Sequence, residues 1–200
     1  MLNRTSLPAA ELPPYQGLSI VAVSLVSSEA LAHEALDVLM ASDVIGFDTE
    51  SKPTFLKGEE STGPHLVQLS IETRAYLFQI PCLHGINELK EILESPHVLK
   101  VGMGLGHDRS VLKSKLGIGI ANVLDLGEML RGPWHRGTVG AKVAVAHFFG
   151  QKFHKSKRTG TSNWANLHLT ETQLLYAAND AHVALRIYRA WLVSREQASD

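Results

Sequence analysis

The segment from Leu169 onward carries the sequence signal that most restricts the fold. Thr170 and Gln173 have the spacing of a capping box, and Leu169 and Leu174 stand at the two positions of a hydrophobic staple. Apolar residues then recur at steps of three and four, which places them on one face of a helix. These residues are Leu174, Ala178, Ala181, Leu185, Tyr188 and Leu192. The pattern predicts a long helix that begins at Thr170 and packs on the core.

Three acidic residues lie where predicted strands end. Asp48 and Glu50 follow the strand-like run Val44–Phe47, and Asp108 comes shortly after a second run, Val98–Gly102. Residues two apart on a strand point to the same face, so the first two carboxylates should project together. Side chains at strand ends are also where sites of α/β proteins gather. We therefore expect all three carboxylates in one region.

Tyr176 and Asp180 lie four residues apart in the predicted helix, one turn apart on the same side. They could face the cation that Asp48 and Glu50 face. Mg²⁺ and Mn²⁺ prefer carboxylate ligands, and two such ions about 3.5–4 Å apart activate water against a phosphodiester. Without a cation, clustered carboxylates would repel one another and take up protons. The pattern therefore predicts a two-metal phosphodiesterase.

Each motif also has a simpler interpretation. Asp-x-Glu is common on strands, Tyr176 could be a packed tyrosine beside a solvated acid, and Asp108 could be a helix N-cap. The order of the motifs and their apolar flanks favour the metal site.

Strand-like runs come first in the chain and alternate with helical patterns later. The predicted strands are 18–26, 44–47, 65–71, 75–80 and 98–102, with a short strand or turn at 123–126. The predicted helices are 28–40, 86–94, 108–116 and 140–149, followed by the C-terminal helix. This order predicts an α/β fold with a mixed sheet, an antiparallel meander plus parallel strands, flanked by helices on both faces.

The length of 200 residues and an apolar fraction of 44% indicate one globular domain, which we place at 18–196. Residues 1–17 read as an extended or mobile lead-in, and 197–200 as a short tail. We find no apolar run long enough for a membrane span and no secretion signal, so we expect an intracellular, cytoplasmic protein without a membrane partner. The single cysteine, Cys82, is expected to be a buried thiol.

The segment from Gln151 to Arg158 gathers four basic residues and an aromatic one. Cations can follow phosphates while aromatic rings stack on unpaired bases. We expect Lys155, Lys157 or Arg158 to contact substrate, and we expect Trp164, six residues further on, to be structural. A solvated loop beside a buried tryptophan is the alternative.

Three blocks of the sequence resemble the exonuclease motifs of the DEDD superfamily, in its tyrosine branch. The blocks are Phe47–Glu50, the stretch from Val101 to Asp108 with Leu112, and Tyr176 with Asp180. The resemblance runs from about residue 19 to 191 and is to ribonuclease D and to Werner syndrome exonuclease-type domains. The other branch has a histidine five positions before its last aspartate, where this chain has Leu175.

The resemblance implies a ribonuclease H-like fold, two Mg²⁺ or Mn²⁺ ions and a role for each motif residue. Asp48, Glu50 and Asp180 would hold the first metal, Asp48 would bridge to the second, and Asp108 would support the second through water. Tyr176 would orient the attacking water, since its reference pKa near 10 makes it a poor base.

The activity that the resemblance implies is 3′–5′ exonucleolytic hydrolysis of single-stranded or frayed nucleic acid, DNA or RNA, with release of nucleoside 5′-monophosphates. Thr49 and His107 are further candidates for substrate contact. A net charge of −1 is unusual for a protein that binds a polyanion. Two bound divalent ions would make the total positive, so binding should depend on metal.

Two other functions stay open at this point. The chain could be a non-catalytic nucleic-acid-binding module of the same fold, or an oligoribonuclease-like enzyme restricted to very short RNAs. A dinucleotide-binding loop at Gly102, Gly104 and Gly106, with Asp125 on the ribose, is a poor match because His107 stands where the third glycine belongs. We therefore expect no nucleotide cofactor. The sequence does not fix DNA or RNA preference, processivity or oligomeric state.

Overall fold

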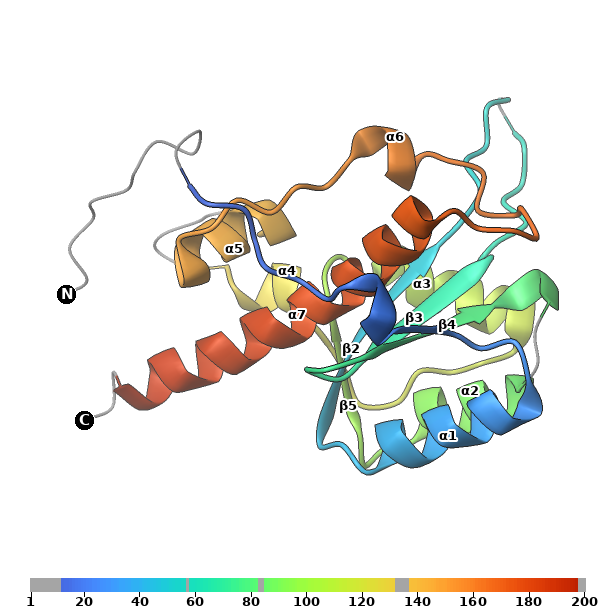
Figure 1. Ribbon diagram of the computed structural model, residues 1–200, viewed down its shortest axis with the longest axis horizontal. Coiled ribbons are helices and arrows are strands. Elements are labelled where there is room, and N and C mark those ends of the chain that lie inside the picture. The colour runs from blue at the N-terminus through green and yellow to red at the C-terminus, as the bar shows by residue number, and fades with distance from the viewer. Residues whose placement is uncertain (1–11, 57, 83–84, 132–136, 198–200) are drawn as a thin grey trace.

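A six-stranded mixed sheet forms the centre of the computed structural model, which describes residues 12–56, 58–82, 85–131 and 137–197 (Figure 1). The strands lie in the order β1-β4-β3-β2-β5-β6. β2, β3 and β4 form an antiparallel meander, β5 and β6 continue parallel to β2, and β1 pairs parallel with β4. The predicted mixed sheet is confirmed. The strands are β1 (Val23–Leu25), β2 (Val44–Glu50), β3 (Leu66–Ser70), β4 (Ala75–Gln79), β5 (Leu99–Gly102) and β6 (Val123–Asp125).

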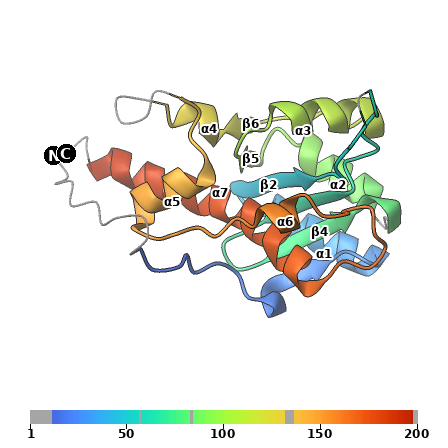
Figure 2. The same cartoon turned by 90° about the horizontal axis from the view of Figure 1, so that it is seen from above.

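Helices cover both faces of this sheet (Figure 2). One apolar cluster joins α1, α2 and the α3 region to one face, and two further clusters join α7 and α5 to the other. The helices are α1 (Glu29–Met40), α2 (Ile86–Glu94), α3 (Gly106–Val111), α4 (Leu126–Met129), α5 (Ala141–Phe149), α6 (Lys157–Gly160) and α7 (Glu171–Gln197). Shorter helical turns are η1 (Ile20–Ala22), η2 (Ile80–Cys82) and η3 (Leu112–Leu116).

The start of α7 is set by the predicted capping box. The Thr170 N–H donates to Gln173 Oε1 over 3.1 Å, and the Gln173 N–H donates to Thr170 Oγ1 over 3.3 Å. The backbone N–H groups of both residues have no carbonyl partner within the helix, and each is hydrogen-bonded by the side chain of the other residue. Leu169 and Leu174 pack on the same apolar cluster. The position of Asp180 along α7 follows from this fixed beginning.

Strand β2 and helix α7 lie in direct contact because of a glycine. Side chains alternate along β2, so that Ile45 and Phe47 pack on the α1 and α2 side while Gly46 faces α7. A Cβ atom on Gly46 would lie 2.0 Å from the Ala181 carbonyl oxygen. Any larger residue would hold α7 away from the strand. Gly46 therefore sets the distance between the residues that follow it on β2 and those beside Ala181.

The structure corrects two predictions about the α3 region. The helix begins at Gly106 rather than at Asp108, so Asp108 lies within the first turn and is not the N-cap. The earlier start follows from Asp125, whose carboxylate accepts hydrogen bonds from the N–H groups of Gly104 and Leu105. The helix then widens into a π-type turn over Leu112–Leu116.

Two other differences concern chain segments that leave the sheet. Cys82 is exposed, not buried as predicted, because it lies in the turn η2 after β4 has ended. The predicted strand 18–26 is reduced to β1, since η1 occupies its first half.

The N-terminal segment from residue 12 to residue 17 is extended and attached to the domain. Tyr15 N–H donates to the Lys152 carbonyl over 3.0 Å, and Lys152 N–H donates to the Pro13 carbonyl over 2.7 Å. The Tyr15 ring packs edge-on against Phe153. The rest of the predicted lead-in, 1–11, and most of the predicted tail, 198–200, lie outside the described residues. Among the helices described, none is long and apolar enough to cross a membrane.

Candidate active site

Three of the predicted carboxylates meet at one end of the sheet. Asp48 and Glu50 are on the last residues of β2, and Asp180 comes from α7, which Gly46 allows to lie against that strand. One oxygen from each of the three side chains lies within 4.8 Å of the others. Asp180 is buried, and the other two are half-buried. Two elements that are distant in sequence thus form one acidic cluster.

Asp108 approaches the same region from the opposite face of the sheet. Its Oδ1 accepts a hydrogen bond from the Thr49 hydroxyl, and Thr49 lies between the two β2 carboxylates in sequence. Asp108 is outside the group of three that could share one ion, but its charge helps to raise the pKa of Asp48. Asp108 therefore lies beside the cluster rather than in it.

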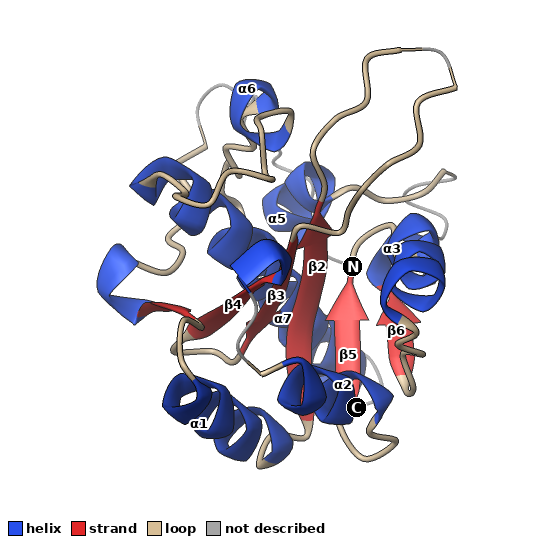
Figure 3. Ribbon diagram, turned by 90° about the vertical axis from the view of Figure 1, so that its right-hand side faces the viewer, coloured by secondary structure: helices blue, strands red, loops and turns tan. Residues whose placement is uncertain are grey.

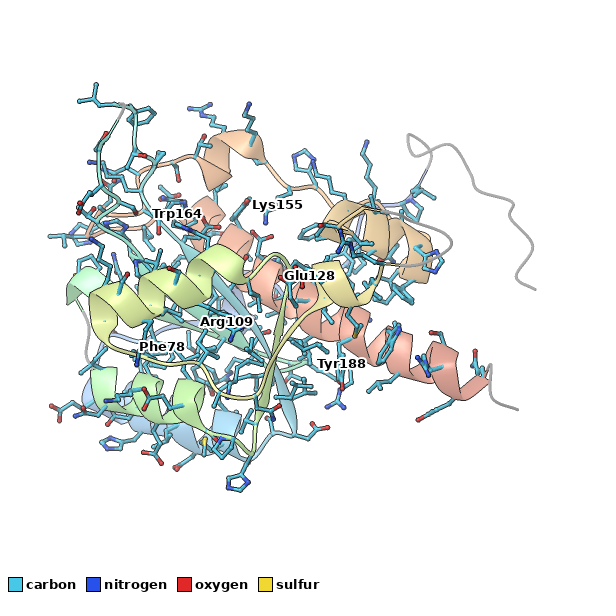
Figure 4. All side chains as sticks on the ribbon, turned by 180° about the vertical axis from the view of Figure 1, so that it is seen from behind. Phe78, Arg109, Glu128, Lys155, Trp164 and Tyr188 are labelled. Atoms are coloured by element: carbon cyan, nitrogen blue, oxygen red, sulfur yellow. The ribbon has the colours of Figure 1, made fainter. Side chains whose placement is uncertain are left out.

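Among the described residues, Lys155 is the cation for which a contact with the cluster is recorded. Its Nζ lies 2.9 Å from Asp180 Oδ2, and 5.6 Å from the centre of the Tyr176 ring. Figure 4 shows Lys155 and Trp164 below α6 and over the first turns of α7. Burial lowers the pKa of Lys155, but the carboxylates of Asp180 and Asp48 outweigh it and raise that pKa above the ordinary value. The lysine stays charged and partly neutralises the cluster.

The phenol of Tyr176 is held by packing on two sides. Its ring lies 6.0 Å from the ring of the fully buried Trp164, and a Cβ atom on Gly160 would come within 2.7 Å of its hydroxyl oxygen. The proximity of that hydroxyl also opposes the rise in the pKa of Asp180, which burial causes and which Lys155 opposes more strongly. Trp164 is structural, as predicted, and its indole N–H donates to the Gly160 carbonyl over 3.2 Å.

The electrostatics of the cluster disfavour its fully ionised form. Burial, and then the charge of Asp180, raise the pKa of Asp48 to about 8. Burial, and then the charge of Asp48, raise the pKa of Glu50 to about 9. Burial also raises the pKa of Asp180, although Lys155 opposes the shift. Burial and the neighbouring Asp180 raise the pKa of Tyr176, so the phenol keeps its proton at neutral pH.

The donor set fits a hard divalent cation. Carboxylate oxygens are the ligands that Mg²⁺ and Mn²⁺ prefer, and three of them converge here with raised pKa values. A single ammonium group balances only one negative charge. A divalent ion would supply the remaining positive charge and let all three carboxylates ionise.

The other predicted substrate contacts lie around this cluster. His107 is exposed in the first turn of α3, next to Asp108. Lys157 and Arg158 are exposed on α6. None of the three touches the carboxylates through a contact that the described structure records.

Asp125 has a structural function in the described residues. Its carboxylate accepts from Gly104, Leu105 and Gly127 N–H groups, and so the alternative dinucleotide site loses its ribose ligand.

Sequence reasoning missed residues that shape the site without carrying its chemistry. Gly46 and Gly160 permit close approach to α7 and to the Tyr176 hydroxyl. Gln68 pairs with Asp48 across β2 and β3 and is fully buried. A glycine within a predicted strand was the available signal for close backbone approach at Gly46. Gly160 and Gln68 had no comparable signal.

Comparison with known proteins identifies the family. A model of the 3′–5′ exonuclease domain matches residues 23–192. The chain belongs to the 3′–5′ exonuclease family. The predicted membership of the DEDD superfamily is confirmed at the level of this family, which is a family of 3′–5′ exonucleases.

Curated relatives share this exonuclease domain. The mouse bifunctional 3′–5′ exonuclease/ATP-dependent helicase WRN is 30% identical over 187 residues, which is 92% of this chain and 13% of the relative. The Drosophila melanogaster exonuclease 3′–5′ domain-containing protein 2 is 33% identical over 148 residues, 73% of this chain and 25% of the relative. The chain thus spans a quarter or less of the length of these two relatives.

Solved exonuclease structures share the fold. The Aedes aegypti Nibbler EXO domain superposes with a TM-score of 0.71 at 27% identity, covering 86% of this chain and 88% of that one. Escherichia coli RNase D superposes with a TM-score of 0.72 at 22% identity, covering 88% of this chain and 46% of that one. Trypanosoma brucei RNase D in complex with RNA U12 superposes with a TM-score of 0.74 at 18% identity, covering 86% of this chain and 63% of that one. These likenesses confirm the predicted ribonuclease H-like fold.

Proposed function

We propose that this chain is a metal-dependent 3′–5′ exonuclease that hydrolyses the terminal phosphodiester of single-stranded or frayed nucleic acid and releases nucleoside 5′-monophosphates. The observation that carries the proposal is the convergence of Asp48, Glu50 and Asp180, with one oxygen of each within 4.8 Å of the others. A cluster of this kind is stable in ionised form only with a multivalent cation, and the family model supplies the reaction type.

Two divalent ions, Mg²⁺ or Mn²⁺, would supply an activated water and stabilise the charge on the leaving oxygen. Asp48, Glu50 and Asp180 are the residues that would hold the first of them, with Asp48 shared with the second. Asp108 would act on the second ion through water, because it lies beside the group of three and is bound by Thr49. These assignments are the ones that the resemblance to the DEDD superfamily implies, and the convergence of Asp48, Glu50 and Asp180 supports the first of them.

Tyr176 would position the attacking water and would not take its proton. Its raised pKa keeps the hydroxyl protonated, and the contacts with Trp164 and Gly160 fix the ring. A protonated phenol can donate one hydrogen bond and accept others, which suits it to orient water. The presence of Tyr176, with Leu175 in the place of a histidine, supports the tyrosine branch of the superfamily.

The Lys155 ammonium group would move from the Asp180 carboxylate to the substrate. With a divalent ion bound at Asp180, the ammonium group would be repelled, and the scissile phosphate is the next negative charge that it could bind. Lys157 and Arg158, exposed on α6, would contact phosphates further along the strand. Thr49 and His107 lie near the carboxylates and are further candidates for contact with the terminal nucleotide.

We propose either DNA or RNA 3′ ends as substrate. The related fold of Trypanosoma brucei RNase D binds RNA in its U12 complex, which supports nucleic acid as the partner here. We also propose an intracellular, cytoplasmic location, as the sequence predicts, and a single exonuclease domain at 18–196.

The direct test is digestion of a 5′-labelled single strand with Mn²⁺ or with EDTA. We expect progressive shortening from the 3′ end with Mn²⁺, nucleoside 5′-monophosphates as product, and no turnover with EDTA. Asp180→Asn should lower the rate by more than about 100-fold, since even outer partners of metal ligands cost 10- to 100-fold. Asp37→Asn, an exposed aspartate on α1, is the matched control and should keep full activity.

Two outcomes would contradict the proposal. Retained hydrolysis in purified Asp180→Asn would remove that residue from the metal site. Binding of the strand without hydrolysis in any divalent ion would favour the non-catalytic binding module. A dinucleotide digested much faster than a longer strand would instead indicate an enzyme for very short substrates.

A further inference from the structure

The side chain of Gln68 carries a buried amide group that has no hydrogen-bond partner. Gln68 is fully buried in the middle of β3, and within the described part of the chain neither its Nε2 nor its Oε1 makes a hydrogen bond. An amide can donate two hydrogen bonds and accept others, and burying it unpaired costs free energy. In a natural fold such a group usually has a bound water or ion, or a part in catalysis, as its explanation. The surroundings of the amide narrow this choice.

The strand pairing places Gln68 beside Asp48. The two residues are direct partners in the antiparallel ladder of β2 and β3, so their side chains lie on the same side of the sheet with Cβ atoms about 4.5–5.5 Å apart. That side is the one that Gly46 also faces, and α7 packs across both strands there (Figure 3). The amide of Gln68 and the carboxylate of Asp48 therefore lie next to each other beneath α7.

The other neighbours of the amide on this face offer little to bind. The ladder partner on β4 and the residue two positions earlier on β3 belong to an apolar cluster with α7. The members of this cluster nearest in sequence and register are Leu66, Leu77, Ala177 and Ala178. Ser70 is polar, but residues two apart on a strand are about 6.7 Å apart, farther than a cross-strand pair. Asp48 is therefore the polar residue best placed to accept a hydrogen bond from the amide.

A carboxylate that holds a metal ion keeps acceptor positions for other donors. Asp48 Oδ1 accepts one hydrogen bond from the Thr49 N–H over 3.0 Å. A carboxylate offers about four lone-pair positions, so an ion and a further N–H group can share those that remain. Ligands of metal ions are commonly held in orientation by hydrogen bonds from residues that do not touch the ion. Gln68 is in the position that such a partner of Asp48 would occupy.

We propose that Gln68 is a positioning residue of the metal centre, whose amide N–H donates to the Asp48 carboxylate and holds it in the orientation that binds the divalent ion. The proposal rests on the proposed function, because it requires that ion. Gln68 itself would touch neither the ion nor the substrate. Without the bond to Asp48, the amide only costs the folded state free energy. Removing the amide should therefore act in opposite directions on stability without metal and on affinity for metal.

The test is Gln68→Met, which keeps the length of the side chain and removes the amide. In calorimetric titration with Mn²⁺ and no substrate, we expect the Kd to rise by about 10- to 100-fold, the usual effect of losing an outer partner of a metal ligand. In urea unfolding with EDTA, we expect the midpoint to equal or exceed that of the wild type, because no buried amide is left unpaired. A side chain with only a packing role would lower the midpoint and leave the Kd unchanged.

Ser70→Ala is the matched control. Ser70 lies on the same strand and face as Gln68, is fully buried, and its hydroxyl also has no partner within the described structure. Its ladder partner on β2 is Gly46, which has no carboxylate to position. Ser70→Ala should therefore keep the Mn²⁺ Kd of the wild type.

A second measurement observes the amide directly and uses the wild type, so it decides even if Gln68→Met is unstable. In ¹⁵N-resolved NMR spectra, adding diamagnetic Mg²⁺ should move one of the two Gln68 side-chain N–H proton signals downfield, as the hydrogen bond to the carboxylate forms. The side-chain signals of Gln79 should stay in place, because its Nε2 already donates to the Asn166 carbonyl over 2.7 Å.

Two results would overturn the role of Gln68 alone. One is an equal Mn²⁺ Kd for Gln68→Met and the wild type, with Gln68 signals that Mg²⁺ does not move. This result would leave a buried water as the partner of the amide. The other is an equal loss of affinity in Gln68→Met and Ser70→Ala, since the effect would then come from packing. A wild type that binds no Mn²⁺ would instead contradict the proposed metal centre, and the role of Gln68 with it.

Discussion

Replacing Asp48 with asparagine should stabilise the protein whenever no metal is bound. Burial and the charge of Asp180 raise the pKa of Asp48 from 3.8 to about 8, so the folded protein retains a proton that the unfolded chain releases. A carboxyl group whose pKa is raised on folding makes its full favourable contribution to the free energy of unfolding below pH 3.8. This contribution is lost as the pH rises toward 8. Asparagine is neutral at every pH and accepts the same hydrogen bond from the Thr49 N–H.

The size of the effect at pH 7 follows from the interval between the unfolded pKa and the pH. About three pH units at 1.36 kcal/mol each give an upper limit of about 4 kcal/mol. Asp48 is only half-buried and shares its proton with its neighbours, so we expect about 1–3 kcal/mol. For a domain of this size that gain corresponds to a rise of about 2–12 °C in Tm.

The assay is urea unfolding in EDTA at pH 4 and at pH 7, repeated with Mn²⁺. Asp48→Asn should match the wild type at pH 4, exceed it at pH 7, and gain little from Mn²⁺, whereas the wild type should gain much. The control Asp37→Asn should follow the wild type in all conditions. Lower stability of Asp48→Asn than of the wild type at pH 7 in EDTA would refute the argument, because the cluster would then not be under electrostatic strain.

Three further changes test other parts of the site. Lys155→Met removes the counter-ion of Asp180. Unfolding in EDTA should show a free energy of unfolding lower by about 1–2 kcal/mol, a value reduced to allow for the exposure of the lysine. Added Mn²⁺ should restore most of this loss. Gly46→Ala should cost about 2–3 kcal/mol or more in thermal unfolding because its Cβ would meet the backbone of α7. Gly119→Ala, whose Cβ would meet only the Lys113 ammonium at 3.8 Å, is the control and should be close to neutral in the same assay. Tyr176→Phe should lower kcat about 100-fold without moving the alkaline limb of the pH profile, since the phenol is not the base; a shifted limb would contradict its positioning role.

The main residues of the site could be predicted from the sequence because their placement depends on interactions between residues that are close together in the chain. Thr170 and Gln173 predicted where α7 begins, and the strand period predicted that Asp48 and Glu50 share a face. Both features need only neighbouring residues. The helix phase then placed Asp180 on the side that faces the sheet.

Other features depended on contacts between distant segments. The approach of α7 to β2 depends on the missing side chain of Gly46, and the ion pair of Lys155 with Asp180 depends on the path of the loop after α5. The early start of α3 depends on Asp125, which arrives from the next strand. No periodicity or short motif encodes such contacts. The exposed Cys82 was missed because burial there depends on where β4 ends.

The most direct test of the metal site is the anomalous scattering of Mn²⁺ in crystals of the protein grown with a nucleoside 5′-monophosphate. The account predicts Mn²⁺ peaks bound by oxygens of Asp48, Glu50 and Asp180, with the Lys155 ammonium displaced from Asp180. Mn²⁺ bound elsewhere, or no Mn²⁺ between β2 and α7 at saturating concentration, would contradict the central claim that these carboxylates form a divalent-metal centre.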